Sequence, residues 1–263
     1  MAHEQALLQG KVAFITGAAQ GIGLAVARAY AAQGAAVVMA DIAHDAVARA
    51  AAGLPVGTQS LALALDVADE AQTEAALAAT LARFGRVDIV VINAGILLLQ
   101  HVVDMELAGW RRVLDVNLTG SFLTAKVFSR QLIRQGGGGR VIFTSSLFGL
   151  RGGRENGAYS ASKFGVTGLM QSLAAELAPH GVQVNSVCPG QMETEMIHKL
   201  FRDRAALTGR TEAEVEGALT GRIPLGRLGG MDELAGTYVY LASELCGYCT
   251  GQSFTVDGGW QVG

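Results

Sequence analysis

The chain has 263 residues, of which half are hydrophobic and 16% are charged, so it can bury the core of one α/β domain. Its net charge of −3 gives no electrostatic support for binding nucleic acid. The segment Met1–Glu4 lacks the basic and apolar regions of a signal peptide, and the apolar stretch Ile89–Leu99 is too short to cross a bilayer. We therefore expect a cytoplasmic protein with one domain over residues 1–263, and neither a membrane nor a nucleic acid as partner.

The first predicted elements are a strand, a glycine-rich turn and a helix. A buried run from Lys11 to Thr16 leads into the turn, and an alanine-rich helix is expected over Leu24–Gln33. Glycines let the backbone approach a pyrophosphate, and the helix start offers free N–H groups and the positive end of its dipole. The pattern predicts a dinucleotide site at Gly17, Gln20, Gly21, Ile22 and Gly23. The alternative is a strand–helix turn without a ligand.

Asp41 ends the second predicted strand, Ala36–Ala40, and lies 18 residues after Gly23. A carboxylate at this place can accept hydrogen bonds from the adenosine ribose of NAD, and it would repel the 2′-phosphate of NADP. No lysine or arginine occurs in Ala18–Gln20 or directly after Asp41. We therefore predict NAD as the cofactor, with a helix N-cap as an alternative or additional role for Asp41.

Strands and helices alternate along the rest of the chain. The predicted strands are rich in Val, Ile, Leu and Ala, as expected for parallel strands covered on both faces: Ser60–Leu65, Asp88–Ile92, Arg140–Ser145, Gln183–Val187 and Ser253–Val256. The predicted helices are Glu70–Phe84, Gly109–Gln135, Gly157–Ala178 and Met231–Ala242. Repeated βα units predict a Rossmann-type, doubly wound parallel sheet of about seven strands with helices on both faces, which binds its ligand at the carboxyl ends of the strands.

Tyr159 and Lys163 are one turn apart on a predicted helix, and Ser146 precedes the tyrosine by 13 residues. Positions i and i+4 share a helix face, and a nearby ammonium lowers the pKa of a phenol from its ordinary value of about 10. A tyrosine tuned in this way can act in general acid–base catalysis while a serine hydroxyl holds the reacting oxygen. Because such a Tyr–Lys pair also occurs on solvated helix faces, the interpretation depends on the glycine turn.

Together, these ordered motifs resemble the short-chain dehydrogenase/reductase family over Gly10–Gly259. The resemblance implies that Asp66 and Val67 lie beside the adenine ring and that Asn93-Ala94-Gly95 ends the fourth strand beside the cofactor. It places the segment after Pro189 at the nicotinamide. Beyond the glycine turn and Asp41, the implied cofactor contacts are Asp66, Val67, Asn93, Ala94, Gly95, Tyr159, Lys163, Pro189, Gly190, Met192 and Thr194.

The resemblance also implies a catalytic tetrad of Asn117, Ser146, Tyr159 and Lys163, and the family's spacing selects Ser146 over the adjacent Ser145. In alcohol oxidation, Tyr159 would take the alcohol proton as a phenolate and Ser146 would orient the substrate oxygen. Lys163 would lower the tyrosine pKa and bind the nicotinamide ribose. Asn117 would help to hold a water that connects Lys163 to solvent. The implied reaction is reversible hydride transfer between the substrate and NAD.

The substrate is a small-molecule alcohol or ketone that the sequence defines only by class. Seven residues that follow the ends of the strands are expected to face the substrate: Ile96, Leu97, Ser146, Phe148, Asn156, Gln191 and Met192. Residues 194–226 are expected to form a substrate lid, in which Thr211-Glu212-Ala213-Glu214 begins a capped helix. The segment Tyr159–Thr194 and the turn Tyr248–Gln252 resemble polyol, sugar-alcohol and vicinal-diol or acetoin dehydrogenases, which predicts a small hydroxylated secondary alcohol.

Several alternatives remain at this stage. Within the family they are a 3-hydroxyacid dehydrogenase and a 3-oxoacyl reductase, and Arg151 and Arg154 keep an acidic substrate open. Outside it they are a non-catalytic dinucleotide-binding sensor and a hydrolase built from Ser146 and Lys163. The three cysteines fit reduced thiols, and Cys246-Gly247-Tyr248-Cys249 lacks a second ligand pair, so no metal site is expected. The resemblance and the small and apolar residues of the two longest predicted helices favour a homotetramer.

Overall fold

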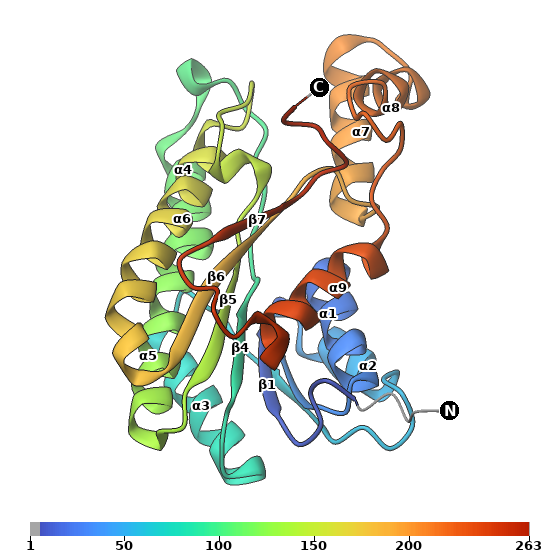
Figure 1. Ribbon diagram of the computed structural model, residues 1–263. Helices are drawn as coiled ribbons and strands as arrows, with labels where there is room; N and C mark the ends of the chain where they lie inside the picture. Colours follow the sequence, from blue (N-terminus) through green and yellow to red (C-terminus); the bar gives the residue numbers. More distant parts are fainter. Residues whose placement is uncertain (1–5, 263) are drawn as a thin grey trace.

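Seven parallel strands form the centre of the computed structural model, which describes residues 6–262 (Figure 1). Their order across the sheet is β3-β2-β1-β4-β5-β6-β7. The strands are β1 (Val12–Thr16), β2 (Ala36–Asp41), β3 (Ser60–Ala64), β4 (Ile89–Ile92), β5 (Gly139–Thr144), β6 (Val182–Pro189) and β7 (Ser253–Val256). All seven predicted strands are confirmed, with ends that differ by at most two residues. Met1–Glu4, on which the expectation about a signal peptide rests, lies outside the described residues.

Nine α-helices of the described chain connect or flank these strands. They are α1 (Gly21–Ala32), α2 (His44–Ala52), α3 (Glu70–Phe84), α4 (Leu107–Leu114), α5 (Gly120–Gln135), α6 (Gly157–Leu177), α7 (Glu195–Thr208), α8 (Glu212–Thr220) and α9 (Met231–Ala242). None of the helices in residues 6–262 has the length and apolar character needed to cross a membrane.

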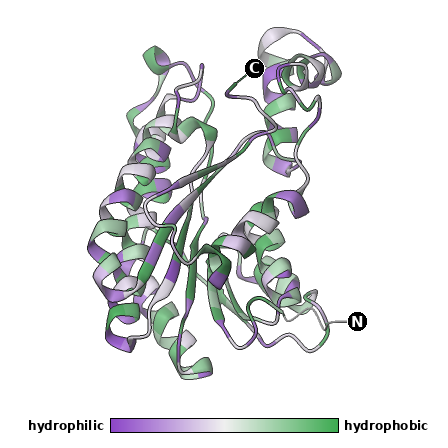
Figure 2. Ribbon diagram, viewed as in Figure 1, coloured by the Kyte–Doolittle hydropathy of each residue, from purple (hydrophilic) through white to green (hydrophobic). Residues whose placement is uncertain are grey.

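Helices cover both faces of the sheet, as the sequence predicts. Helices α1, α2 and α9 pack on one face, where the Tyr30 hydroxyl donates to the carbonyl of Tyr238 at 3.0 Å. Helices α3, α5 and α6 pack on the other, where the rings of Phe14 and Phe128 stack with centroids 4.1 Å apart (Figure 1). Figure 2 shows hydrophobic residues concentrated along the central strands and the helix sides that meet them. Burial on both faces explains why the strands lack a polar–apolar alternation.

The strand order reverses at β1, which lies between β2 and β4. Chain connections leave β1 towards one side of the sheet and β4 towards the other, so a crevice opens at their carboxyl ends. The turn after β1 and the loop after β4 therefore meet at the place where an open α/β sheet binds its ligand.

The helices differ from the expected elements in several places: α2 was not predicted, and α1 begins at Gly21 and not at Leu24. The predicted helix Gly109–Gln135 begins at Leu107 and is interrupted by a π-helical segment, Asp115–Thr119, between α4 and α5. Within residues 194–226 the chain forms α7 and α8, whose apolar sides pack with Leu147 and Trp260, and their action as a substrate lid stays a prediction. The capped helix start at Thr211 is confirmed, because Thr211 and Glu214 form a reciprocal capping box.

Candidate active site

A cavity of about 1500 Å³ runs along the carboxyl ends of the strands. The turn after β1 and Asp41 line one end of it, and Ser146, Tyr159 and Lys163 line the other. Of the residues predicted for the site, the following line this cavity: Gly17, Gln20, Gly21, Ile22, Asp41, Asp66, Val67, Asn93, Ala94, Gly95, Ser146, Phe148, Asn156, Tyr159, Lys163, Pro189, Gly190, Gln191, Met192 and Thr194. Two predicted residues, Gly23 and Asn117, are not part of the cavity lining.

At Gly17 and Gly23 the glycine turn is closed so tightly that a side chain does not fit. A Cβ at Gly23 would lie 2.2 Å from the carbonyl oxygen of Gly17, and one at Gly17 would lie 2.9 Å from Cα of Ala94. Gly17 also has φ +63°, in the left-handed region. Helix α1 begins just beyond, with Gln20 as N-cap, and neither a capping side chain of the described chain nor an acidic first-turn residue covers its N–H groups. This cradle fits a pyrophosphate.

Asn93 connects the end of β4 to the glycine turn. Its Nδ2 donates to the carbonyl oxygens of Thr16 at 3.0 Å and Gly17 at 3.1 Å. The backbone N–H groups of Asn93 and Ala94 donate to Oγ1 of Thr16 at 2.9 and 3.1 Å. Thr16 was not among the predicted site residues. Its place at the last position of β1, directly before Gly17, is the signal that would have pointed to it.

Two carboxylates shape the end of the cavity beside β2 and β3. Asp41 accepts hydrogen bonds from the backbone N–H of Ala19 at 3.1 Å and of Ala43 at 3.0 Å. The N-cap of α2 is Ala43, so the alternative role of Asp41 as that cap is wrong. Asp66 accepts from the N–H of Ala68 at 3.0 Å. Asp41 therefore presents a fixed negative charge beside the glycine turn.

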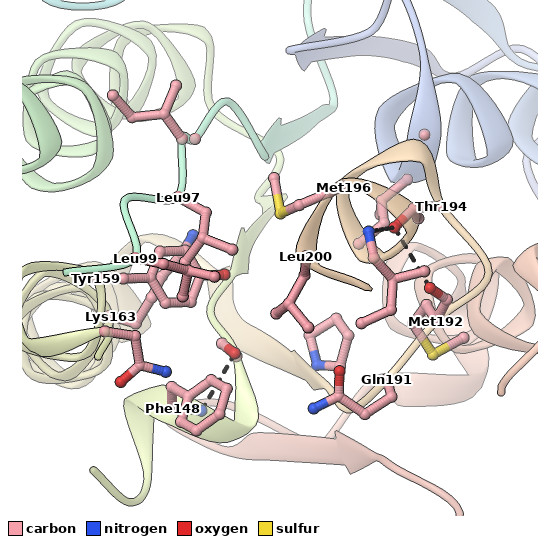
Figure 3. Close-up of a pocket in the computed structure, with 18 of the residues that line it drawn as sticks. Leu97, Leu99, Phe148, Tyr159, Lys163, Gln191, Met192, Thr194, Met196 and Leu200 are labelled. Carbon is pink, nitrogen blue, oxygen red and sulfur yellow. Dashed lines mark hydrogen bonds between the residues drawn. The ribbon is translucent and has the colours of Figure 1, made fainter. Parts of the chain in front are cut away.

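The two adjacent serines after β5 have different surroundings. Oγ of Ser145 donates to the carbonyl of Lys163 at 3.2 Å and bonds Oγ1 of Thr167 at 3.1 Å, so it connects β5 to α6. Oγ of Ser146 accepts from the N–H of Phe148 at 3.1 Å (Figure 3). The Ser146 side chain acts to lower the pKa of Tyr159. Ser145 is thus held between β5 and α6, which favours Ser146 as the serine that serves the cavity.

Lys163 is buried, with 3% of its surface exposed, and its Nζ donates to the carbonyl of Thr144 at 2.7 Å. Burial lowers the pKa of this lysine to about 8. Burial raises the pKa of Tyr159 above its ordinary value, and the Ser146 side chain opposes only part of that effect. The expected lowering of the tyrosine pKa by Lys163 is thus wrong for the protein alone. The ammonium is bound to Thr144 and lies 5.7 Å from the phenol ring centroid.

Asn117 lies in the π-helical segment and is fully buried. Its Oδ1 accepts from the N–H of Ile96 at 2.8 Å, and its Nδ2 donates to the carbonyl of Ile96 at 2.9 Å and to Oγ of Ser162 at 3.0 Å. The amide therefore fixes the loop after β4 to α6. Its main-chain carbonyl accepts the Ser121 hydroxyl at 2.6 Å. Single π-turns of this kind are frequent at functional sites.

The segment after β6 closes the cavity opposite the glycine turn. A Cβ at Gly190 would lie 2.6 Å from Cα of Asp257, so only glycine fits there. Thr194 is the N-cap of α7, and its Oγ1 accepts from the N–H of Ile197 at 3.2 Å. Met192 pairs with Gly229 in an isolated bridge. These contacts fix the backbone of residues 190–194 against the start of α7.

Residues proposed to face the substrate line the same cavity as Tyr159, with Leu97 and Phe148 on its side and Gln191 and Met192 on the other (Figure 3). Ile96, Leu97, Phe148 and Gln191 line the cavity, whereas Oδ1 of the buried Asn156 is occupied by the Ser160 hydroxyl at 2.9 Å. Arg151 and Arg154 also line the cavity and are exposed. Four further residues line the cavity and were not predicted from the sequence: Leu99, Met196, Leu200 and Trp260. Met196 and Leu200 are four residues apart, so helical spacing in the expected lid was the available signal.

Comparisons with known proteins cover almost the whole chain. A family model described as Enoyl-(Acyl carrier protein) reductase matches residues 17–261. L-rhamnose 1-dehydrogenase (NAD(P)(+)) of Azotobacter vinelandii is 38% identical, with 96% of this chain and 97% of the relative covered. Sorbitol dehydrogenase of Cereibacter sphaeroides is 36% identical, with 96% and 98% covered. The crystal structure of a short-chain type dehydrogenase/reductase from Mycobacterium marinum superposes with TM-score 0.90 at 39% identity, with 99% of both chains covered.

Proposed function

Because the chain belongs to the short-chain dehydrogenase/reductase family of nicotinamide-dependent oxidoreductases, we propose that it interconverts a small secondary alcohol and its ketone with NAD. Polyols, sugar alcohols and vicinal diols are the proposed substrate class. The observation that carries the proposal is the meeting of Ser146, Tyr159 and Lys163 at one end of a cavity whose other end is the glycine cradle beside Asp41. The names of the sugar and polyol dehydrogenases among the relatives support this class.

The bound dinucleotide supplies the hydride acceptor or donor, and the protein supplies position and charge. The glycine turn and the start of α1 hold the pyrophosphate, and Asp41 accepts from the adenosine ribose. Ser146 donates to the substrate oxygen and holds it beside the hydroxyl of Tyr159. Tyr159 takes the proton in alcohol oxidation and returns it in ketone reduction. With the dinucleotide bound, the positive charge of Lys163 would favour the phenolate, an effect that is not seen in the protein alone.

In this mechanism the hydroxyl of Tyr159 is required for turnover. Tyr159→Phe should lower kcat by several orders of magnitude, roughly 10²–10⁴-fold, because it removes the proton donor and acceptor. NADH binding, followed by fluorescence, and the thermal unfolding midpoint should be retained. The exposed Tyr248 provides the matched control, since Tyr248→Phe removes the same hydroxyl far from the cavity. Unchanged turnover in Tyr159→Phe would contradict this role.

The choice of NAD over NADP rests on Asp41. Its carboxylate is fixed by two backbone N–H groups, and neither Ala18–Gln20 nor Ile42–Ala43 contains a cation that could bind a 2′-phosphate. Reduction of each cofactor should be followed at 340 nm with a panel of polyols and diols. We expect NAD to be preferred, and Asp41→Ala to shift the NAD/NADP ratio of kcat/KM by about 10- to 100-fold towards NADP. A wild-type preference for NADP would contradict this role of Asp41.

The non-catalytic sensor remains the second candidate from another class. It predicts NADH binding without turnover of any alcohol in the panel, and no kinetic effect of Tyr159→Phe. Ser146, Tyr159 and Lys163 line one cavity, which favours the enzyme, because a sensor has no need of this proton-transfer group.

A further inference from the structure

The wall of the cavity beside Tyr159 is apolar on several sides (Figure 3). Leu97 and Leu99 approach from the loop after β4, Phe148 from the short helix after β5, and Met196 and Leu200 from α7. The rings of Phe148 and Tyr159 meet edge to face with centroids 6.5 Å apart. Met196 leaves 43% of its surface exposed, so this wall is open to be covered by a substrate.

One polar side chain in the same space has no partner. Gln191 has only 9% of its surface exposed, and its amide faces the cavity (Figure 3). Within residues 6–262 this amide makes no hydrogen bond, unlike the amides of Asn117 and Asn156. Its polar atoms are open to the cavity, since they are not among the buried atoms of the described chain that lack a partner. A substrate oxygen that reaches Gln191 can therefore form a hydrogen bond with this amide.

The apolar wall and the free amide of Gln191 together carry one inference. We infer that the preferred substrate carries its oxygen atoms at one end, as a vicinal diol or hydroxyketone, and an apolar body at the other. The inference rests on the proposed function and narrows its substrate class. The reacting oxygen lies at Ser146 and Tyr159, the neighbouring oxygen at Gln191, and the hydrocarbon part against Leu97, Leu99, Phe148, Met196 and Leu200. Further hydroxyl groups along the body would face these side chains without hydrogen-bond partners.

Two pairs of substrates test this arrangement, because each pair has the same carbon skeleton. Butane-2,3-diol is compared with threitol, and trans-cyclohexane-1,2-diol with inositol, by kcat/KM with saturating NAD. We expect the less hydroxylated member of each pair to be favoured by about 100-fold. Preference for threitol and inositol would overturn the inference while leaving the proposed function intact. Absence of turnover with all four would contradict the proposed function and the inference together.

Variants then assign the preference to the residues named. Gln191→Leu should remove the preference for cyclohexane-1,2-diol over cyclohexanol, because the second oxygen loses its partner. Met196→Gln should lower the diol-to-inositol ratio about tenfold, and its partly exposed position limits any effect on folding. The exposed Leu245 gives the control, Leu245→Gln, which should leave both ratios unchanged. Unchanged ratios in Gln191→Leu and Met196→Gln, with NADH binding retained, would overturn the inference.

Discussion

Lys163 shows that a functional side chain can reduce the stability of the fold that holds it. Its pKa in the folded protein is about 8, against 10.5 for the unperturbed group. Since one pKa unit corresponds to about 1.4 kcal/mol, keeping this buried amine charged at pH 7 costs about 3 kcal/mol. The bond from Nζ to the carbonyl of Thr144 offsets part of this cost.

A pH dependence of stability follows from this pKa. Above pH 8 the folded protein releases the Lys163 proton, whereas the unfolded chain keeps it until about pH 10.5, so the unfolded state binds more protons and stability rises with pH. The wild type should therefore gain about 2 kcal/mol relative to Lys163→Met between pH 8 and pH 10. Urea unfolding of both proteins at each pH measures the difference. Lys199→Met, at an exposed lysine, should run parallel to the wild type, and a parallel course for Lys163→Met would contradict the prediction.

At the scale of elements, the sequence predicted best where the signal was local. The strands were recognisable from apolar runs, and the start of α8 from its capping box at Thr211. Helix α2 was missed although alanine favours helices, because it has only nine residues and its N-cap, Ala43, supplies no capping bond from its side chain. The π-helical turn at Asn117 was not predictable, since the contacts of Asn117 to Ile96 and Ser162 exist only after folding. The raised pKa of Tyr159 depends on tertiary burial for the same reason.

The junction between β1 and α1 allows a test of close packing at the cradle. In Gly23→Ala the new Cβ would lie 2.2 Å from the carbonyl of Gly17 and 2.7 Å from Nδ2 of Asn93, so the turn must open. We expect NADH affinity to fall by at least about tenfold and stability by about 1–3 kcal/mol. Fluorescence titration and thermal unfolding measure these effects. Gly236→Ala, in the exposed middle of α9 with no atom within 4 Å, should instead be neutral or stabilising by up to about 1 kcal/mol.

For the whole molecule, the face of the sheet that carries α5 and α6 indicates where copies of the chain could meet (Figure 1). Phe122 and Ile133 on α5 and Phe164 on α6 are large apolar side chains that leave 46%, 39% and 47% of their surfaces exposed. Several such residues on neighbouring helices are typical of a subunit interface. They support association of copies through a two-fold contact at this patch, and the predicted homotetramer would need a second interface in addition.

Light scattering coupled to size exclusion tests this assembly directly. A tetramer would have four times the chain mass of 27.3 kDa. Phe164→Glu places a charge that must lose its water when α6 is covered, so the assembly should separate into smaller species while the far-ultraviolet circular dichroism is retained. Val56→Glu, at a fully exposed valine after α2, should leave the mass unchanged, because that side chain lies away from α5 and α6. A wild-type mass equal to one chain would show that these apolar side chains stay in contact with water, and the prediction would then be wrong.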